Sequence, residues 1–140
     1  MEEIFVKLLH RNSGKEVDAV IKCDSAQGGY IQISSDDGNV WHASSGNLFD
    51  SLVSIRREME KEAIFPLCNG ARINLAVSSG GRQASATRRV YKVEIGQQAQ
   101  RHNLVDIFEY AECDSVGTVE EQKEFNRKWV SSLREKSHKA

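Results

Sequence analysis

The sequence predicts an α+β protein, with an antiparallel sheet of about six or seven strands and two main helices. Apolar and polar residues alternate along short runs in the first 43 residues and again between residues 64 and 95, as in strands with one buried face. Two longer segments repeat apolar residues at helical spacing. The strand runs are segregated from the helices, which favours α+β over a parallel βαβ arrangement. At 140 residues, we expect a single domain spanning positions 1–140.

The first 43 residues read as a four-stranded antiparallel meander. Turn-forming sequences separate the strands, including Asn12-Ser13-Gly14 and the acidic SSDDGN at positions 34–39. Gly28-Gly29 indicates a bend or bulge before the third strand. The predicted strands are Ile4–His10, Glu16–Cys23, Tyr30–Ile33 and Val40–Ala43.

The first predicted helix spans Asn47–Ala63. Its apolar residues recur at i, i+4, i+7 and i+11, which forms one stripe that can pack on the sheet. We expect Arg56 and Glu60 to form an i, i+4 ion pair on the opposite, exposed face. The stripe consists of Leu48, Leu52, Ile55 and Met59.

The second predicted helix spans Val119–Lys136. Thr118 and Glu121 have the spacing of a capping box, in which each side chain accepts a hydrogen bond from the other residue's backbone amide. Behind this start, Phe125, Trp129 and Leu133 form the stripe by which the helix should dock.

Short apolar runs between the two helices predict the remaining strands. Ile64–Leu67 is followed by the turn dipeptide Asn69-Gly70, and Pro66 within this run suits an edge strand. Further strands are expected at 73–77 and 88–95, separated by a long exposed loop from Ser78 to Thr87. We assign Leu104–Tyr110 to a strand at the edge of the sheet.

The charge distribution is uneven. Residues 63–105 contain six basic residues and one acid, whereas residues 1–62 contain seven basic and eleven acidic residues. The net charge of −1 argues against non-specific binding to nucleic acid, which usually needs a strongly basic domain. A local excess of arginine is nevertheless typical of a surface that meets an acidic partner.

The sequence contains no recognisable catalytic or cofactor motif. Three widely separated cysteines have no metal-ligand spacing, so we expect free thiols packed as small apolar groups. His42 faces Asp36 and Asp37 across a predicted hairpin, but a strand histidine exposed to water is the preferred interpretation. We therefore expect no metal, no cofactor and no enzymatic activity. The acidic N-terminus lacks the features of a secretory signal, and no apolar run matches a membrane span, so we expect a cytoplasmic protein.

Several segments resemble a family of small bacterial proteins. They are LFDSLVSIRREME, PLCNGAR, SSGG, YKV and LVDIF, of which Cys68–Arg72 is the most specific. The chain resembles the immunity proteins of contact-dependent growth inhibition and related polymorphic toxin systems. The resemblance implies a cytosolic antidote that tightly binds one cognate toxin domain, with a nuclease as the expected toxin class, and that does not itself contact nucleic acid or a membrane.

Two groups of residues are candidates for binding such a partner. Acidic residues can plug the basic cleft of a nuclease, and basic residues can bind its catalytic carboxylates. We favour the basic group, because it joins a long exposed break to an excess of arginine. The basic group, with a neighbouring tyrosine, comprises Arg72, Arg82, Arg88, Arg89 and Tyr91. The acidic group comprises Asp36, Asp37, Glu109, Glu112 and Asp114.

Two other classes of function remain open from the sequence. A nucleic-acid-binding or regulatory adaptor would use the basic central stretch, and its binding would depend steeply on salt. An enzyme with an unrecognised site would place a titrating group with a perturbed pKa in a deep pocket.

Overall fold

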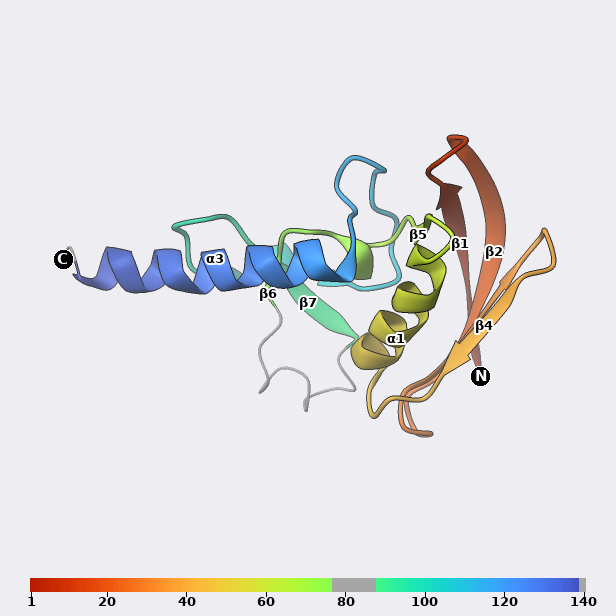
Figure 1. Cartoon of the computed structure of the whole chain (residues 1–140). Helices are drawn as coiled ribbons and strands as arrows, with labels where there is room; N and C mark the ends of the chain where they lie inside the picture. The colour runs from red at the N-terminus through yellow and green to blue at the C-terminus, as the bar shows by residue number, and fades with distance from the viewer. Residues whose placement is uncertain (77–87, 139–140) are drawn as a thin grey trace.

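The computed structural model describes residues 1–76 and 88–138 and confirms the α+β class (Figure 1). Among these residues, eight strands form two antiparallel sheets rather than one, and two α-helices accompany them. The predicted loop from Ser78 to Thr87, which includes the candidate Arg82, lies outside the described residues.

The first sheet has five strands in the order β4-β3-β2-β1-β5. Its first four strands form the predicted meander, and β5 pairs with the far edge of β1 through Leu8↔Pro66. Pro66 therefore lies in an edge strand, as predicted, where its missing N–H leaves no gap in the sheet. The strands are β1 (Glu2–His10), β2 (Lys15–Asp24), β3 (Tyr30–Ser35), β4 (Val40–Ala43) and β5 (Ile64–Pro66).

Side-chain alternation gives this sheet one core face and one outer face. Val6 and Leu8 of β1 are buried with residues of β2, β3 and α1. Phe5 and Lys7, which alternate with Val6 and Leu8 along the strand, are exposed, because successive strand residues point to opposite faces. The close approach of Gly29 to Asn47 fixes the bend before β3: a Cβ on Gly29 would lie 2.2 Å from the Asn47 carbonyl carbon.

Helix α1 (Leu48–Glu60) packs between the two sheets (Figure 1). The Asn47 side chain caps its N-terminus by accepting a hydrogen bond from the Asp50 amide (2.9 Å). The predicted apolar stripe is fully buried. The helix ends at Glu60 and not at Ala63, which has a positive φ of 56° and cannot continue a right-handed helix.

The second sheet is made of shorter strands than the sequence predicts. It consists of β6 (Leu75–Ala76), β7 (Arg89–Lys92) and β8 (Leu104–Asp106), in that order. The strand predicted at 88–95 is confirmed only in its first half: β7 ends at Lys92, and Ile95 is 51% exposed. Leu104 does begin an edge strand, but this strand lasts only three residues before the chain turns toward Tyr110.

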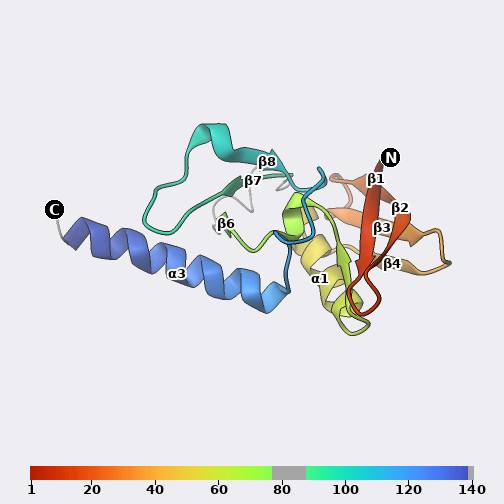
Figure 2. The ribbon, with the colours of Figure 1, turned by 90° about the horizontal axis from the view of Figure 1, so that it is seen from above.

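Helix α3 (Val119–His138) begins as predicted, extends away from the first sheet and runs beside the second (Figures 1 and 2). The capping box is present, with the Thr118 amide donating to Glu121 Oε1 (2.9 Å) and the Glu121 amide donating to Thr118 Oγ1 (3.0 Å). Further along, Trp129 Nε1 donates to the Gln97 carbonyl (2.7 Å). The first turn of α3 lies against α1, while its later turns contact the loop that follows β7.

The predicted ion pair between Arg56 and Glu60 is wrong. Arg56 is buried, and its guanidinium donates to the carbonyls of Gly70 and Gly117 and to Gln122 Oε1, each at 3.0 Å. Arg56 follows Leu52 by four residues and so continues the buried stripe of α1. Burial lowers the pKa of Arg56 to about 10, so the side chain stays charged at neutral pH.

Gly70 permits a close approach at this junction. It lies in the short 3₁₀ turn η1 (Asn69–Ala71), which confirms the predicted turn. Its φ is not positive; the constraint is space, because a Cβ would lie 2.5 Å from Leu52 Cδ2 and 3.2 Å from the Ile107 carbonyl oxygen. Glycine thus brings the Gly70 carbonyl within reach of Arg56.

We predict that Arg56→Ala destabilises the fold by about 3 kcal/mol, because it leaves buried carbonyls without their charged donor. Urea unfolding followed by circular dichroism measures this change. Arg57→Ala is the matched control: Arg57 is its exposed neighbour, and its loss should change stability by less than about 0.5 kcal/mol. Equal unfolding midpoints for the two variants would contradict the structural role of Arg56.

Candidate functional site

A groove on the outer side of the first sheet has the features of a protein-binding site. Its volume is about 530 Å³. Two large aromatic side chains on its rim, Phe5 and Tyr110, are 85% and 63% exposed, although such residues are usually buried. The lining residues come from β1, β2, the β3–β4 turn, the segment after β5 and the loop after β8; they are Phe5, Val6, Lys7, Asp18, Ala19, Val20, Asp36, Leu67, Phe108 and Tyr110.

The groove carries a net negative charge. Lys7 Nζ pairs with Asp18 Oδ1 across β1 and β2 (2.6 Å). The lining has three charged residues, and the third, Asp36, has no opposite charge within the lining. The Asp36 amide donates to the Asp18 carbonyl (2.9 Å), which fixes the acidic turn against the sheet.

The structure places the other acidic candidates in two exposed segments. Asp37 lies beside Asp36 in the β3–β4 turn, and Glu109 adjoins Tyr110 on the groove rim. Glu112 and Asp114 follow in the same loop and are exposed. The groove thus brings Asp36 and the Glu109 segment together, although they are more than 70 positions apart in the sequence.

His42 is an exposed residue of β4, opposite Gln32 of β3, which confirms the preferred interpretation. Instead, His10 Nε2 approaches Asp37 Oδ2 at 3.5 Å. The side-chain hydrogen bond with Ser35 lowers the pKa of Asp37, with a smaller contribution from His10. His10 reaches the turn from the end of β1, a contact that the hairpin pattern alone does not indicate.

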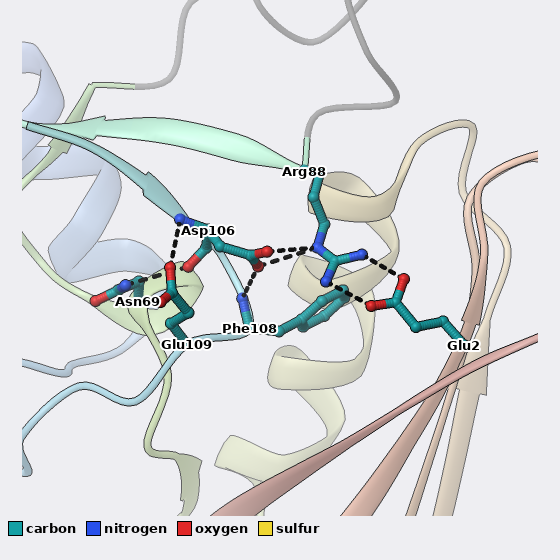
Figure 3. A network of polar contacts seen from close by, with 6 residues as sticks. All are labelled: Glu2, Asn69, Arg88, Asp106, Phe108 and Glu109. Atoms are coloured by element: carbon teal, nitrogen blue, oxygen red, sulfur yellow. Dashed lines mark hydrogen bonds and ion pairs between the residues drawn. The ribbon is translucent and has the colours of Figure 1, made fainter. Parts of the chain in front are cut away.

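Arg88 is engaged within the fold (Figure 3). Its Nε donates to both carboxylate oxygens of Asp106 (3.0 and 2.9 Å), and its Nη1 and Nη2 donate to Glu2 (2.8 and 3.0 Å). The guanidinium also lies 5.0 Å from the centre of the Phe108 ring. Arg88 therefore joins the N-terminal strand to the second sheet.

The remaining basic candidates occupy separate elements. Arg72 follows η1, is partly buried, and donates from Nε to Asn69 Oδ1 (2.8 Å). Arg89 and Tyr91 lie on one face of β7, with Arg89 exposed and Tyr91 partly buried. Together with the internal role of Arg88, these positions leave Arg89 as the most accessible of the described arginine candidates.

The cysteines are free, but only two match the expected packing. Cys23 and Cys68 are buried, and burial raises the pKa of Cys68 to about 11, so that thiol is protonated at neutral pH. Cys113 is exposed, contrary to expectation. Within residues 1–76 and 88–138, no group of three or more His, Cys, Asp and Glu side chains is arranged to hold a metal ion. In that same part of the chain, every helix is too short or too polar to cross a bilayer.

The sequence analysis missed the two exposed aromatic residues of the groove. A signal for Phe5 exists: IFVKLL at positions 4–9 is too continuously apolar for a strand with one buried face, so some of its residues must face outward. Tyr110 gives no such signal, because its exposure depends on how the loop after β8 turns.

Comparison with protein-family models finds no match for this chain, and a search of curated proteins finds none either. The resemblance to immunity proteins therefore remains a hypothesis, and the functional argument depends on the groove and its surroundings.

The pKa of Glu2 lies below its ordinary value of 4.5 because of its hydrogen bonds with Arg88. A lowered carboxyl pKa stabilises the folded state above pH 4.5, and this contribution disappears as the pH falls through the folded-state value. We predict that Arg88→Gln raises the pKa of Glu2, measured by NMR titration of its side-chain carboxyl carbon. Arg89→Gln is the control and should leave the titration unchanged; an unshifted Glu2 in Arg88→Gln would contradict the ion pair.

Proposed function

We propose that this protein is an antidote that binds and neutralises a cognate bacterial toxin domain in the cytoplasm. The observation that carries the proposal is the groove, where Phe5 and Tyr110 are exposed beside net negative charge. Exposed aromatic side chains on a rigid strand are typical anchors of protein interfaces. The family resemblance supplies the class of partner.

The acidic surface suits a nuclease as the toxin. Nuclease clefts are basic because they bind phosphates, so an acidic surface attracts them from a distance and speeds association. Asp36 and Asp37 lie in one exposed turn, and Glu109 lies across the groove rim from them. The toxin's basic groups would meet these carboxylates, while the aromatic anchors bury apolar area.

The structure changes which of the two candidate surfaces we favour. The sequence favours the basic group for its excess of arginine. Two carboxylates already bind Arg88, and Arg72 is held by Asn69. Arg88, whose donors bind within the fold, has few left for a partner, and of the described arginines in this group only Arg89 is exposed, so we favour the acidic surface.

The test is co-expression with the toxic C-terminal domain of a secreted protein encoded beside this gene. We predict that the wild-type chain protects the cells and purifies with the toxin domain. Asp36→Lys with Asp37→Lys should slow association about tenfold at low salt and flatten its salt dependence. Surface plasmon resonance at several salt concentrations measures both effects.

Arg89→Glu is the matched control, because it reverses an exposed charge on the second sheet. It should bind the toxin like wild type. If Arg89→Glu weakens binding and the aspartate variant does not, the basic surface is the interface. If the chain binds DNA or RNA with a steep salt dependence and does not bind the toxin, the adaptor function is correct instead.

A further inference from the structure

One long edge of β1 is open beside the groove. β5 pairs with only three β1 residues, Leu8, Leu9 and His10. The last backbone bond along this edge is from the Leu67 amide to the Lys7 carbonyl (2.8 Å). Among the described residues, no backbone group bonds to this edge from Glu2 to Val6.

Alternation determines which backbone groups face the opening. In an antiparallel strand, the N–H and C=O of one residue point to the same side, and those of the next residue point to the other. Since the Lys7 carbonyl points away from β2, the N–H and C=O groups of Glu3 and Phe5 also point to the open edge. Those of Ile4 and Val6 point toward β2.

The segment across this edge is held firmly in place. The Asn69 amide donates to the Glu109 carbonyl (2.8 Å), and the Ala111 amide donates to the Leu67 carbonyl (3.2 Å). Tyr110 forms an isolated bridge with Cys68. Phe108 and Tyr110 therefore form a fixed wall of the groove, and the open backbone of β1 lies along its other side.

We propose that the open edge of β1 binds an extended, basic segment of a partner protein as an added strand. The exposed N–H and C=O groups of Glu3 and Phe5 supply the backbone pairing that a strand needs. Alternate side chains of the added segment contact the Phe5 and Tyr110 rings. This inference depends on the proposed function, in which the segment belongs to the toxin.

Charge complementarity makes the occupant basic. Glu3 and Glu109 are exposed at the two sides of the opening, and Asp36 gives the lining its net negative charge. A lysine- or arginine-bearing strand meets carboxylates along this edge. A second copy of this chain would instead place its own Glu3 against the same acidic surroundings, and like charges at close range oppose that pairing.

The first experiment uses two synthetic decapeptides of alternating valine with either lysine or glutamate. Fluorescence anisotropy should show that the lysine peptide binds at least tenfold more tightly than the glutamate peptide. Methylating alternate backbone nitrogens of the lysine peptide should abolish binding, because an added strand needs those donors. Equal binding of the lysine and glutamate peptides, or full binding of the methylated one, would overturn the proposal.

Amide hydrogen exchange of the wild-type chain by NMR gives a readout at single residues. The lysine peptide should slow exchange at Glu3 and Phe5 and leave Ile4 and Val6 unchanged, because only the first two amides face the opening. A different result would overturn the proposal: Glu3 and Phe5 are protected without peptide, the protection rises with protein concentration, and ultracentrifugation detects a dimer. That result would show that a second copy of the chain fills the edge.

Two pairs of variants separate the edge from the exposed surface in general. Phe5→Ser should weaken the lysine peptide at least tenfold, whereas Val40→Ser, which removes a 56% exposed apolar side chain on β4, should not. Glu3→Pro removes an edge N–H without breaking a bond to β2, so it should weaken binding of the lysine peptide. Glu3→Ala is its matched control, because it removes the same carboxylate and keeps the N–H. If wild type and Phe5→Ser bind the toxin equally, the inference that a partner strand binds at the open edge of β1 is overturned. The proposed antidote function would still stand, because the toxin is bound.

Discussion

The buried guanidinium of Arg56 organises the junction between the helices and the loops. It draws together the Gly70 carbonyl with the Gly117 carbonyl and the Gln122 side chain, which belong to two segments far apart in the sequence. A buried arginine needs several acceptors in fixed positions, because an unpaired charge in the interior is highly unfavourable. The position of η1, and with it that of the following loops, depends on satisfying this one side chain.

That constraint extends to the groove. Next to Gly70, the Asn69 amide binds the Glu109 carbonyl, so the turn positioned by Arg56 also positions the segment from Phe108 to Tyr110. The Arg88 network acts from the other side, since it ties Glu2 at the start of β1 to Asp106 at the end of β8 (Figure 3). The two networks hold the two walls of the groove at a fixed separation, which is the preorganisation that a tight binding site requires.

The basic centre of the chain shows why local charge counts are weak guides to binding surfaces. An excess of arginine between two acidic flanks resembles a site for an acidic partner. In the folded chain, part of that excess neutralises the protein's own carboxylates: Arg88 pairs with Glu2, from an acidic flank, and with Asp106. The charged groups beside the groove that remain available to a partner are acidic, and include Asp36 and Glu109. These acidic groups support the antidote proposal.

The sequence by itself determined the α+β class, the four-stranded meander, both helices and the Thr118 capping box. Each of these depends on contacts between residues a few positions apart, so spacing alone predicts them. Tertiary structure decided the burial of Arg56, the division of the strands into two sheets and the exposure of Tyr110. Those outcomes depend on which distant segments supply acceptors and apolar neighbours, and no local pattern encodes that choice. The groove belongs to this second kind, because its two walls meet only in the folded chain.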